Sequence, residues 1–146
     1  MMFYFLLTVF FLGLDQLVKW LVVVNIPLNQ SHPFIPGLFN LTNLRNPGAA
    51  WSILEGQQWF FVVVTVVALV VIGLLMKHYR GYQWAEVSLC LILAGTLGNF
   101  IDRLRFGYVV DMFELLPVNF PVFNVADALL TVGVVLLAIQ ILKEDD

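Results

Sequence analysis

Four long apolar segments constrain the fold of this chain more strongly than any other feature of its sequence. They run over about 3–24, 59–76, 84–103 and 123–142, and a segment needs roughly 20 apolar residues to cross a bilayer. Of the 146 residues, 61% are hydrophobic and only 12% are charged, and the mean hydropathy is +0.93. A soluble domain of this size has too little interior to hide so much apolar surface. We therefore predict one domain, residues 1–146, which is an all-α membrane protein with four transmembrane helices.

The loops between these segments predict a small β-sheet beside the helices. The first loop contains a strand-like stretch over 38–44, a Pro-Gly turn and a second expected strand from Ala49 to Leu54. The last loop contributes the β-prone run 108–110. The turn over 77–82 is short, which predicts that the second and third helices form an antiparallel pair. Because the number of spans is even, we expect the sheet on one membrane face and both termini at the other.

The charge distribution favours an orientation with both termini in the cytoplasm and the sheet on the outer face. The turn with Lys77 and Arg80 is short and lies next to two spans, where basic residues count most toward the cytoplasmic side. No basic stretch and no cleavage site accompany the first segment, so we predict a retained span and not a signal peptide. The net charge is only −3, and no run of Lys or Arg indicates a nucleic-acid partner.

Several charged and amide side chains interrupt the apolar segments, and they predict a functional site. A charge near the middle of a bilayer costs at least about 2–3 kcal/mol, so such residues usually face the bundle interior. Asp15 and Lys19 are one helical turn apart and can form an ion pair. Two further groups each share a helix face, on the third and on the fourth helix. They are Gly95, Gly98, Asn99 and Asp102, and Asn124, Asp127 and Thr131.

The predicted topology gathers many of these residues at the membrane face that carries the long loops. The third helix ends there and the fourth begins there. Lys19 lies one or two turns below this face, and Asp127 lies about four residues into its span, or roughly 6 Å at 1.5 Å per residue. The residues expected to converge are Asp102, Arg103, Asp111, Asn124 and Asp127.

Some of these residues have a structural alternative to a functional role. Asp15 and Lys19 are equally consistent with a buried ion pair that fixes helix register. Asn99 and Asn124 are more typical of hydrogen bonds that link neighbouring helices. The glycines of the third helix are expected to let a neighbouring helix approach closely.

The remaining acidic residues differ in how well a structural reading fits them. For Asp102 we favour a salt bridge with its neighbour Arg103. Asp111 and Asp127 fit a structural role least, because neither has a cation at helix spacing. Cys90 is the only cysteine and lies in an apolar stretch, which is typical of a small core residue and excludes an intrachain disulfide.

The sequence lacks the residue patterns of other common catalytic sites. The two histidines, His32 and His78, lie in loops on opposite sides of the membrane, so no metal-ligand cluster is expected. There is no H-E-x-x-H, no G-x-S-x-G and no phosphate-binding loop. By elimination, any hydrolytic chemistry must use carboxylates.

Five motifs, in order along nearly the whole chain, resemble the lipoprotein signal peptidase family, signal peptidase II. One such motif would be weak, but five in register on four spans are specific. They cover Asp15–Lys19, Asn46–Trp51, Gly98–Arg103, Gly107–Asp111 and Phe123–Asp127.

The resemblance implies an intramembrane aspartic endopeptidase with Asp111 and Asp127 as catalytic residues. It implies a prolipoprotein substrate whose Cys carries diacylglycerol and which is cut just before that Cys. It further implies a monomer among membrane lipids, located in the bacterial inner membrane, with its site near the outer face and with no cofactor or metal. The supporting residues that it implies are Asp15, Lys19, Asn46, Gly48, Asn99, Asp102, Arg103 and Asn124.

The chemistry of two neighbouring carboxylates agrees with that assignment. In a medium of low dielectric constant the two cannot both ionise easily, so the pair shares one proton. The ionised member takes a proton from water, while the neutral member hydrogen-bonds the scissile carbonyl and then protonates the leaving amine. Two other functions stay open at this point. One is a transporter with a polar path lined by Asp15, Lys19, Asp102 and Asp127, and the other is a non-enzymatic membrane scaffold.

Overall fold

The computed structural model describes residues 2–48 and 56–144 of the chain. These residues form four long helices and three strands. The predicted strand from Ala49 to Leu54 lies outside the described residues. The elements, in chain order, are α1 Met2–Asn25, β1 Ser31–Ile35, β2 Phe39–Asn46, α2 Gln58–His78, α3 Gln83–Phe106, β3 Val109–Leu115 and α4 Val125–Glu144.

The four predicted spans are confirmed as helices that are long and apolar enough to cross a membrane. A helix rises 1.5 Å per residue, so about 20 residues match the thickness of the hydrocarbon core. The outer surface of α2 carries large apolar side chains such as Val63, Val67 and Leu74, all of which are exposed. A continuous apolar surface of this kind is typical of a helix that faces lipid.

Helix α3 lies at the centre of the bundle and packs against each of the other three helices. Glycines of α3 allow its backbone to lie close to two of these helices. A Cβ atom on Gly95 would overlap the carbonyl oxygen of Ala126 in α4, and one on Gly98 would lie 2.5 Å from the Asp15 carboxylate of α1. The predicted role of these glycines in close helix packing is therefore confirmed.

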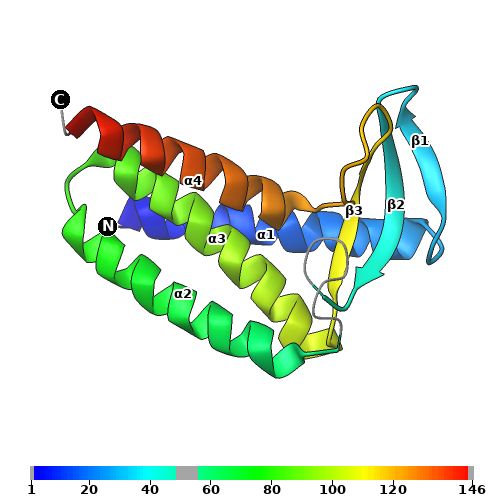
Figure 1. The fold of residues 1–146 in the computed structure, drawn as a ribbon, viewed down its shortest axis with the longest axis horizontal. Coiled ribbons are helices and arrows are strands. Elements are labelled where there is room, and N and C mark those ends of the chain that lie inside the picture. Colours follow the sequence, from blue (N-terminus) through cyan, green and yellow to red (C-terminus); the bar gives the residue numbers. More distant parts are fainter. Residues whose placement is uncertain (1, 49–55, 145–146) are drawn as a thin grey trace.

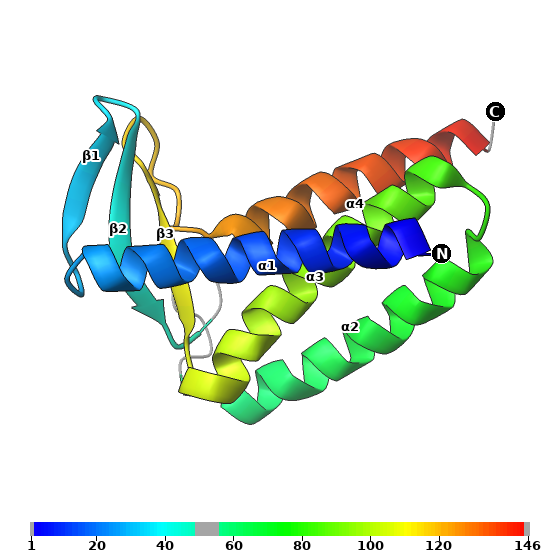
Figure 2. The ribbon, with the colours of Figure 1, turned by 180° about the vertical axis from the view of Figure 1, so that it is seen from behind.

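The three strands form an antiparallel sheet in the order β1-β2-β3. The sheet lies at one end of the bundle, and both termini lie at the other end (Figure 1). Helix α1 extends far enough to reach the sheet (Figure 2), and Val22 of α1 and Ile26 just after it pack against Val110 and Met112 of β3. The predicted sheet built from the first and last loops is confirmed.

Strand β1 was not predicted. Its five residues are all exposed, and it contains Pro33, so it lacks the alternation of buried and exposed positions by which a strand is recognised. It is an edge strand, where a proline can be accommodated because one side of the strand has no hydrogen-bonding partner.

Candidate active site

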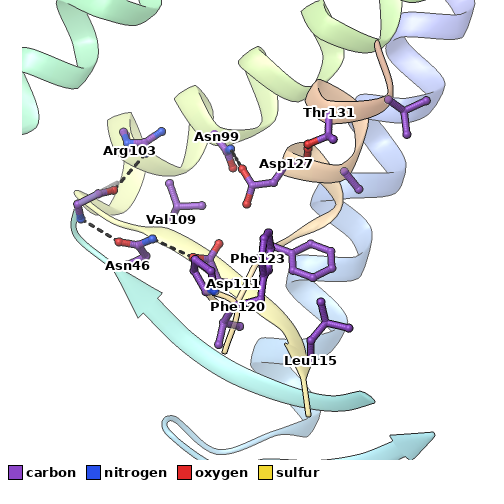
Figure 3. A pocket seen from close by; sticks show the side chains of 15 residues that line it. Asn46, Asn99, Arg103, Val109, Asp111, Leu115, Phe120, Phe123, Asp127 and Thr131 are labelled. Atoms are coloured by element: carbon purple, nitrogen blue, oxygen red, sulfur yellow. Dashed lines mark hydrogen bonds between the residues drawn. The ribbon is translucent and has the colours of Figure 1, made fainter. Parts of the chain in front are cut away.

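Two aspartates, one from β3 and one from α4, line a single cavity at the junction of the sheet and the helices. Helix α3 ends at Gly107, whose φ of 76° favours glycine, and the chain then turns into β3, which carries Asp111. A loop leads from β3 to α4, which carries Asp127. The cavity has a volume of about 490 Å³, and both aspartates line it (Figure 3). The predicted convergence of Asp111 and Asp127 is thus confirmed.

Asn124 connects the two aspartates. Its Nδ2 donates to Asp111 Oδ1 at 2.7 Å, and its Oδ1 accepts the backbone N–H of Asp127 at 2.9 Å. Asp127 Oδ2 accepts the backbone N–H of Asn124 in return at 3.2 Å. This reciprocal arrangement resembles a capping box, with Asn124 just before α4 and Asp127 in its first turn. Asn124 was predicted to lie within the fourth helix, but it lies just before α4. Asp127 is therefore the third residue of α4, closer to the start of the helix than predicted.

A second amide fixes Asp111 from the side of β2. Asn46 Nδ2 donates to Asp111 Oδ2 at 3.0 Å, and Asn46 Oδ1 accepts the backbone N–H of Gly48 at 3.0 Å. The Gly48 carbonyl oxygen accepts a long hydrogen bond of 3.4 Å from Arg103 Nη2. The Arg103 guanidinium lies 4.7 Å from the centre of the Phe61 ring. Asp111 therefore accepts an amide N–H at each of its two oxygens, and Figure 3 shows the bond from Asn46.

Asn99 binds the other aspartate. Its Nδ2 donates to Asp127 Oδ1 at 2.8 Å. Its Oδ1 accepts hydrogen bonds from Lys19 Nζ at 3.1 Å and from Asn124 Nδ2 at 3.0 Å. Because an ammonium can only donate, the Asn99 carbonyl must face Lys19, and its N–H₂ group must face Asp127.

Lys19 is the centre of a buried charge cluster beneath the cavity. Its Nζ lies 3.0 Å from Asp15 Oδ2 and 3.0 Å from Asp102 Oδ2. The predicted Asp15–Lys19 pair is confirmed. The predicted salt bridge between Asp102 and Arg103 was wrong, because adjacent residues point in different directions from a helix. Asp102 faces α1, whereas Arg103 lines the cavity and binds the Gly48 carbonyl.

The two aspartates of this cluster also hold the backbone of the elements that carry the cavity aspartates. Asp15 Oδ1 accepts the N–H of Ala126 at 2.9 Å, and Asp102 Oδ2 accepts the N–H of Val110 at 3.1 Å. Each of these N–H groups belongs to the residue immediately before one of the cavity aspartates. The Lys19 cluster therefore fixes the position of both β3 and α4 at the cavity.

Gln16 completes this cluster and was not predicted. Its Nε2 lies 3.2 Å from Asp15 Oδ2, 3.1 Å from Asp102 Oδ1 and 3.2 Å from the Gly98 carbonyl oxygen. The signal was present in the sequence, because Gln16 is a polar residue inside an apolar span and stands next to Asp15.

The two cavity aspartates differ in their surroundings. Asp111 is only 2% exposed, and this burial raises its pKa from 3.8 to about 6. The hydrogen bonds from Asn46 and Asn124 lower this pKa, whereas the negative charge of Asp127 raises it. Asp127 is only half-buried and lies in the first turn of α4.

One cavity thus holds one carboxyl group whose pKa is raised to about 6 and a second, half-buried carboxyl group in the first turn of a helix. Such a pair can take a proton from water and give one to a leaving group. Within residues 2–48 and 56–144, no ion pair joins either cavity aspartate to a cation. The same part of the chain contains no group of three His, Cys, Asp or Glu side chains arranged to hold a metal ion.

Comparisons of the sequence with known proteins give a consistent result. A family model described as signal peptidase (SPase) II matches residues 7–143. A protein of Lactiplantibacillus plantarum called lipoprotein signal peptidase is 53% identical over 142 residues, which cover 97% of this chain and 95% of that protein. A protein of Enterococcus faecalis with the same name is 52% identical over 143 residues, which cover 97% of this chain and 89% of that protein.

Comparisons of the fold agree with those of the sequence. A bacterial membrane enzyme solved at 2.3 Å resolution superposes with a TM-score of 0.94 and 36% sequence identity, over 100% of this chain and 91% of that one. A second structure described in the same words, solved at 1.9 Å, gives a TM-score of 0.90 and 37% identity over 98% of this chain and 94% of that one.

Proposed function

This chain belongs to the signal peptidase II family, and on that premise we propose that it is an aspartic endopeptidase that removes signal peptides from bacterial prolipoproteins. Asp111 and Asp127 are its catalytic residues. The observation that carries this assignment is that both carboxylates line one cavity and that a single side chain, Asn124, is hydrogen-bonded to both residues.

In the proposed mechanism, the proton shared by the pair resides on Asp111. Asp127 takes a proton from water, and the resulting hydroxide attacks the carbonyl carbon of the scissile peptide bond. The Asp111 carboxyl group hydrogen-bonds the carbonyl oxygen and then transfers its proton to the amine nitrogen as the C–N bond breaks. At that point the proton of the pair resides on Asp127, and proton exchange with water restores the starting state.

The position of the cavity suits a substrate that is anchored in lipid. It lies where the sheet meets the helices, and apolar side chains such as Leu115, Phe120 and Phe123 line it beside the aspartates (Figure 3). A diacylglyceryl-Cys can keep its acyl chains among lipids while the peptide bond before it meets water and the two carboxylates. We further propose that the enzyme acts as a monomer in contact with membrane lipids and that it cuts immediately before the lipidated Cys.

The assignment is tested by incubating purified protein with a diacylglyceryl-modified prolipoprotein in detergent. The wild type releases the signal peptide by a cut before the lipidated Cys, whereas Asp111→Asn and Asp127→Asn do not. An Asn side chain keeps the shape of the carboxylate, but it cannot carry the charge or exchange the proton. Glu114→Gln is a matched control in the same strand as Asp111, because its carboxylate binds Ser31 and Asn40 and does not line the cavity. Near-normal cleavage by either Asn variant would falsify the aspartic-peptidase assignment.

We further propose that both termini lie in the cytoplasm and that the cavity opens near the outer face of the cytoplasmic membrane. The basic turn between α2 and α3 supports this orientation. In a Cys90→Ala background, a membrane-impermeant thiol reagent should label Gln30→Cys from outside the cell and leave His78→Cys unlabelled. The reverse labelling pattern would refute this orientation but would leave the assignment of the catalytic aspartates unaffected.

A further inference from the structure

A second cavity lies at the opposite end of the bundle from the aspartates. It has a volume of about 640 Å³, within the range of about 300–1,000 Å³ that is usual for small-molecule sites. Its walls are the first half of α1, the end of α2 with the turn that follows it, and the part of α3 from Glu86 to Leu97. Most of the lining is apolar, and it includes Phe5, Val9, Leu93 and Leu97.

Two basic side chains stand at the rim of this apolar cavity. Lys77 is in the last turn of α2, and Arg80 is in the turn that follows. Both are exposed, and neither forms an ion pair or a side-chain hydrogen bond with any residue in 2–48 or 56–144. The one acidic residue in the lining, Glu86, lies against the Tyr4 hydroxyl. The rim therefore carries a net positive charge that no described protein group neutralises.

An apolar cavity with unpaired basic residues at its rim can be compared with the molecules that a membrane contains. A signal peptide has basic residues at its cytoplasmic end, which Lys77 and Arg80 would repel. A second copy of this chain would present the same basic turn and would be repelled as well. An anionic phospholipid matches both features, because its acyl chain fills an apolar trough and its phosphate pairs with Lys and Arg.

We propose that this cavity binds one anionic phospholipid, with an acyl chain between α1 and α2 and the headgroup phosphate between Lys77 and Arg80. The lipid occupies the space that separates the two helices, and it thereby braces α2, which otherwise packs along α3. This binding does not depend on the aspartate chemistry at the other end of the bundle.

The test is native mass spectrometry of the full chain, purified in a neutral detergent and titrated with phosphatidylglycerol or with phosphatidylcholine of the same acyl chains. The wild type should retain one phosphatidylglycerol in preference to phosphatidylcholine. The double variant Lys77→Gln/Arg80→Gln should lose about thirtyfold of that preference, which corresponds to about 1 kcal/mol for each basic residue. Both side chains are exposed, so the double variant is expected to fold.

Two further variants separate a built site from general attraction between charges. Lys143→Gln removes an exposed basic residue near the C-terminal end of α4, outside the cavity lining, and should leave the preference unchanged. Leu97→Trp fills the trough and should reduce retention of both lipids. Inorganic phosphate at the same concentration should not compete, because it has no acyl chain.

Several results would overturn the proposal. They are equal retention of the two lipids by the wild type, an unchanged preference in Lys77→Gln/Arg80→Gln, and an equal loss of preference in Lys143→Gln. Displacement of the lipid by a synthetic signal peptide, or its loss on formation of a dimer, would assign the cavity to that other occupant.

Discussion

The molecule contains two pairs of aspartates, one pair in the cavity and one in the cluster beneath it. The two pairs differ in the groups that contact their carboxylates. The inner pair, Asp15 and Asp102, shares the ammonium group of Lys19 at 3.0 Å on each side. The cavity pair, Asp111 and Asp127, is bound by amide and backbone N–H groups. The inner carboxylates are bound to a buried cation and hold their neighbours in place, whereas two neighbouring carboxylates without a cation compete for a proton.

The comparison also shows how the two pairs depend on each other. Each inner aspartate accepts the backbone N–H of the residue just before a cavity aspartate. The inner pair therefore acts on position, and the cavity pair acts on the substrate. We expect mutations of the inner pair mainly to lower the stability of the protein and mutations of the cavity pair mainly to lower the rate of cleavage.

The largest effect on stability is expected for Lys19→Met. Without the ammonium group, Asp15 and Asp102 are two buried carboxylates with no cation, and stranding a buried partner costs about 3–5 kcal/mol. The melting temperature of the purified protein should fall strongly. Lys143→Met, which removes an exposed lysine, serves as the control. If Lys19→Met melts at the same temperature as the wild type, the inner pair does not have the structural role assigned to it.

A smaller loss of stability is expected for Asp15→Asn. The new amide can still accept the Ala126 N–H, but its own N–H₂ group then faces Lys19 and Gln16, and a lost buried hydrogen bond costs about 1–3 kcal/mol. Asp102→Asn should behave alike. Thermal unfolding measures both losses. Unaltered melting curves combined with lost cleavage would move these two residues into the catalytic group.

The pH dependence of cleavage should reveal the proton on Asp111. Because the proposed mechanism needs this residue neutral, kcat/KM should fall as the pH rises through about 6. The Asn46 amide favours the ionised form of Asp111, so Asn46→Ala should raise the pKa and move the falling limb to higher pH. Thr131→Val alters the cavity wall but removes no hydrogen bond to Asp111, so the pH at which kcat/KM falls should not change. If kcat/KM of Asn46→Ala falls at the same pH as in the wild type, or at a lower pH, the assignment of the proton to Asp111 would be contradicted.

The smallest effect is expected for Cys90→Ala. Cys90 is completely buried in α3, and its Sγ lies 3.4 Å from the Tyr4 carbonyl oxygen, remote from the cavity lining. Cleavage should be unchanged, and it should also persist in the presence of EDTA, because the proposed mechanism uses neither a thiol nor a metal. Inhibition in either experiment would mean that the chemistry has been misread.

The helices were predictable because the bilayer leaves little choice of structure. Apolar segments of this length must form helices to satisfy their backbone groups in lipid, and all four predictions were confirmed. The partly alternating sequence over 38–44 also predicted strand β2. Strand β1 was not, since an exposed edge strand that contains a proline buries nothing that would shape its sequence.

The membership of the site was more predictable than its contacts. Of the ten candidate residues, nine line the cavity or belong to the cluster beneath it, and the tenth, Asn124, is hydrogen-bonded to both cavity aspartates. The partner of Asp102 was missed because Lys19 is remote in sequence, whereas Arg103 is adjacent. The capping role of Asn124 could have been found, because Asn followed by Asp three residues later is a local pattern that does not depend on tertiary contacts.

The most direct test of the account is a comparison of cleavage rates for Asp111→Asn, Asp127→Asn and the double variant, each checked for wild-type thermal unfolding. The account states that the two aspartates form one catalytic unit. Members of such a unit are not additive, so the double variant should cleave no more slowly than either single variant. If the two losses multiply, or if one single variant retains substantial turnover, the residues act independently, and the account of a shared proton is contradicted.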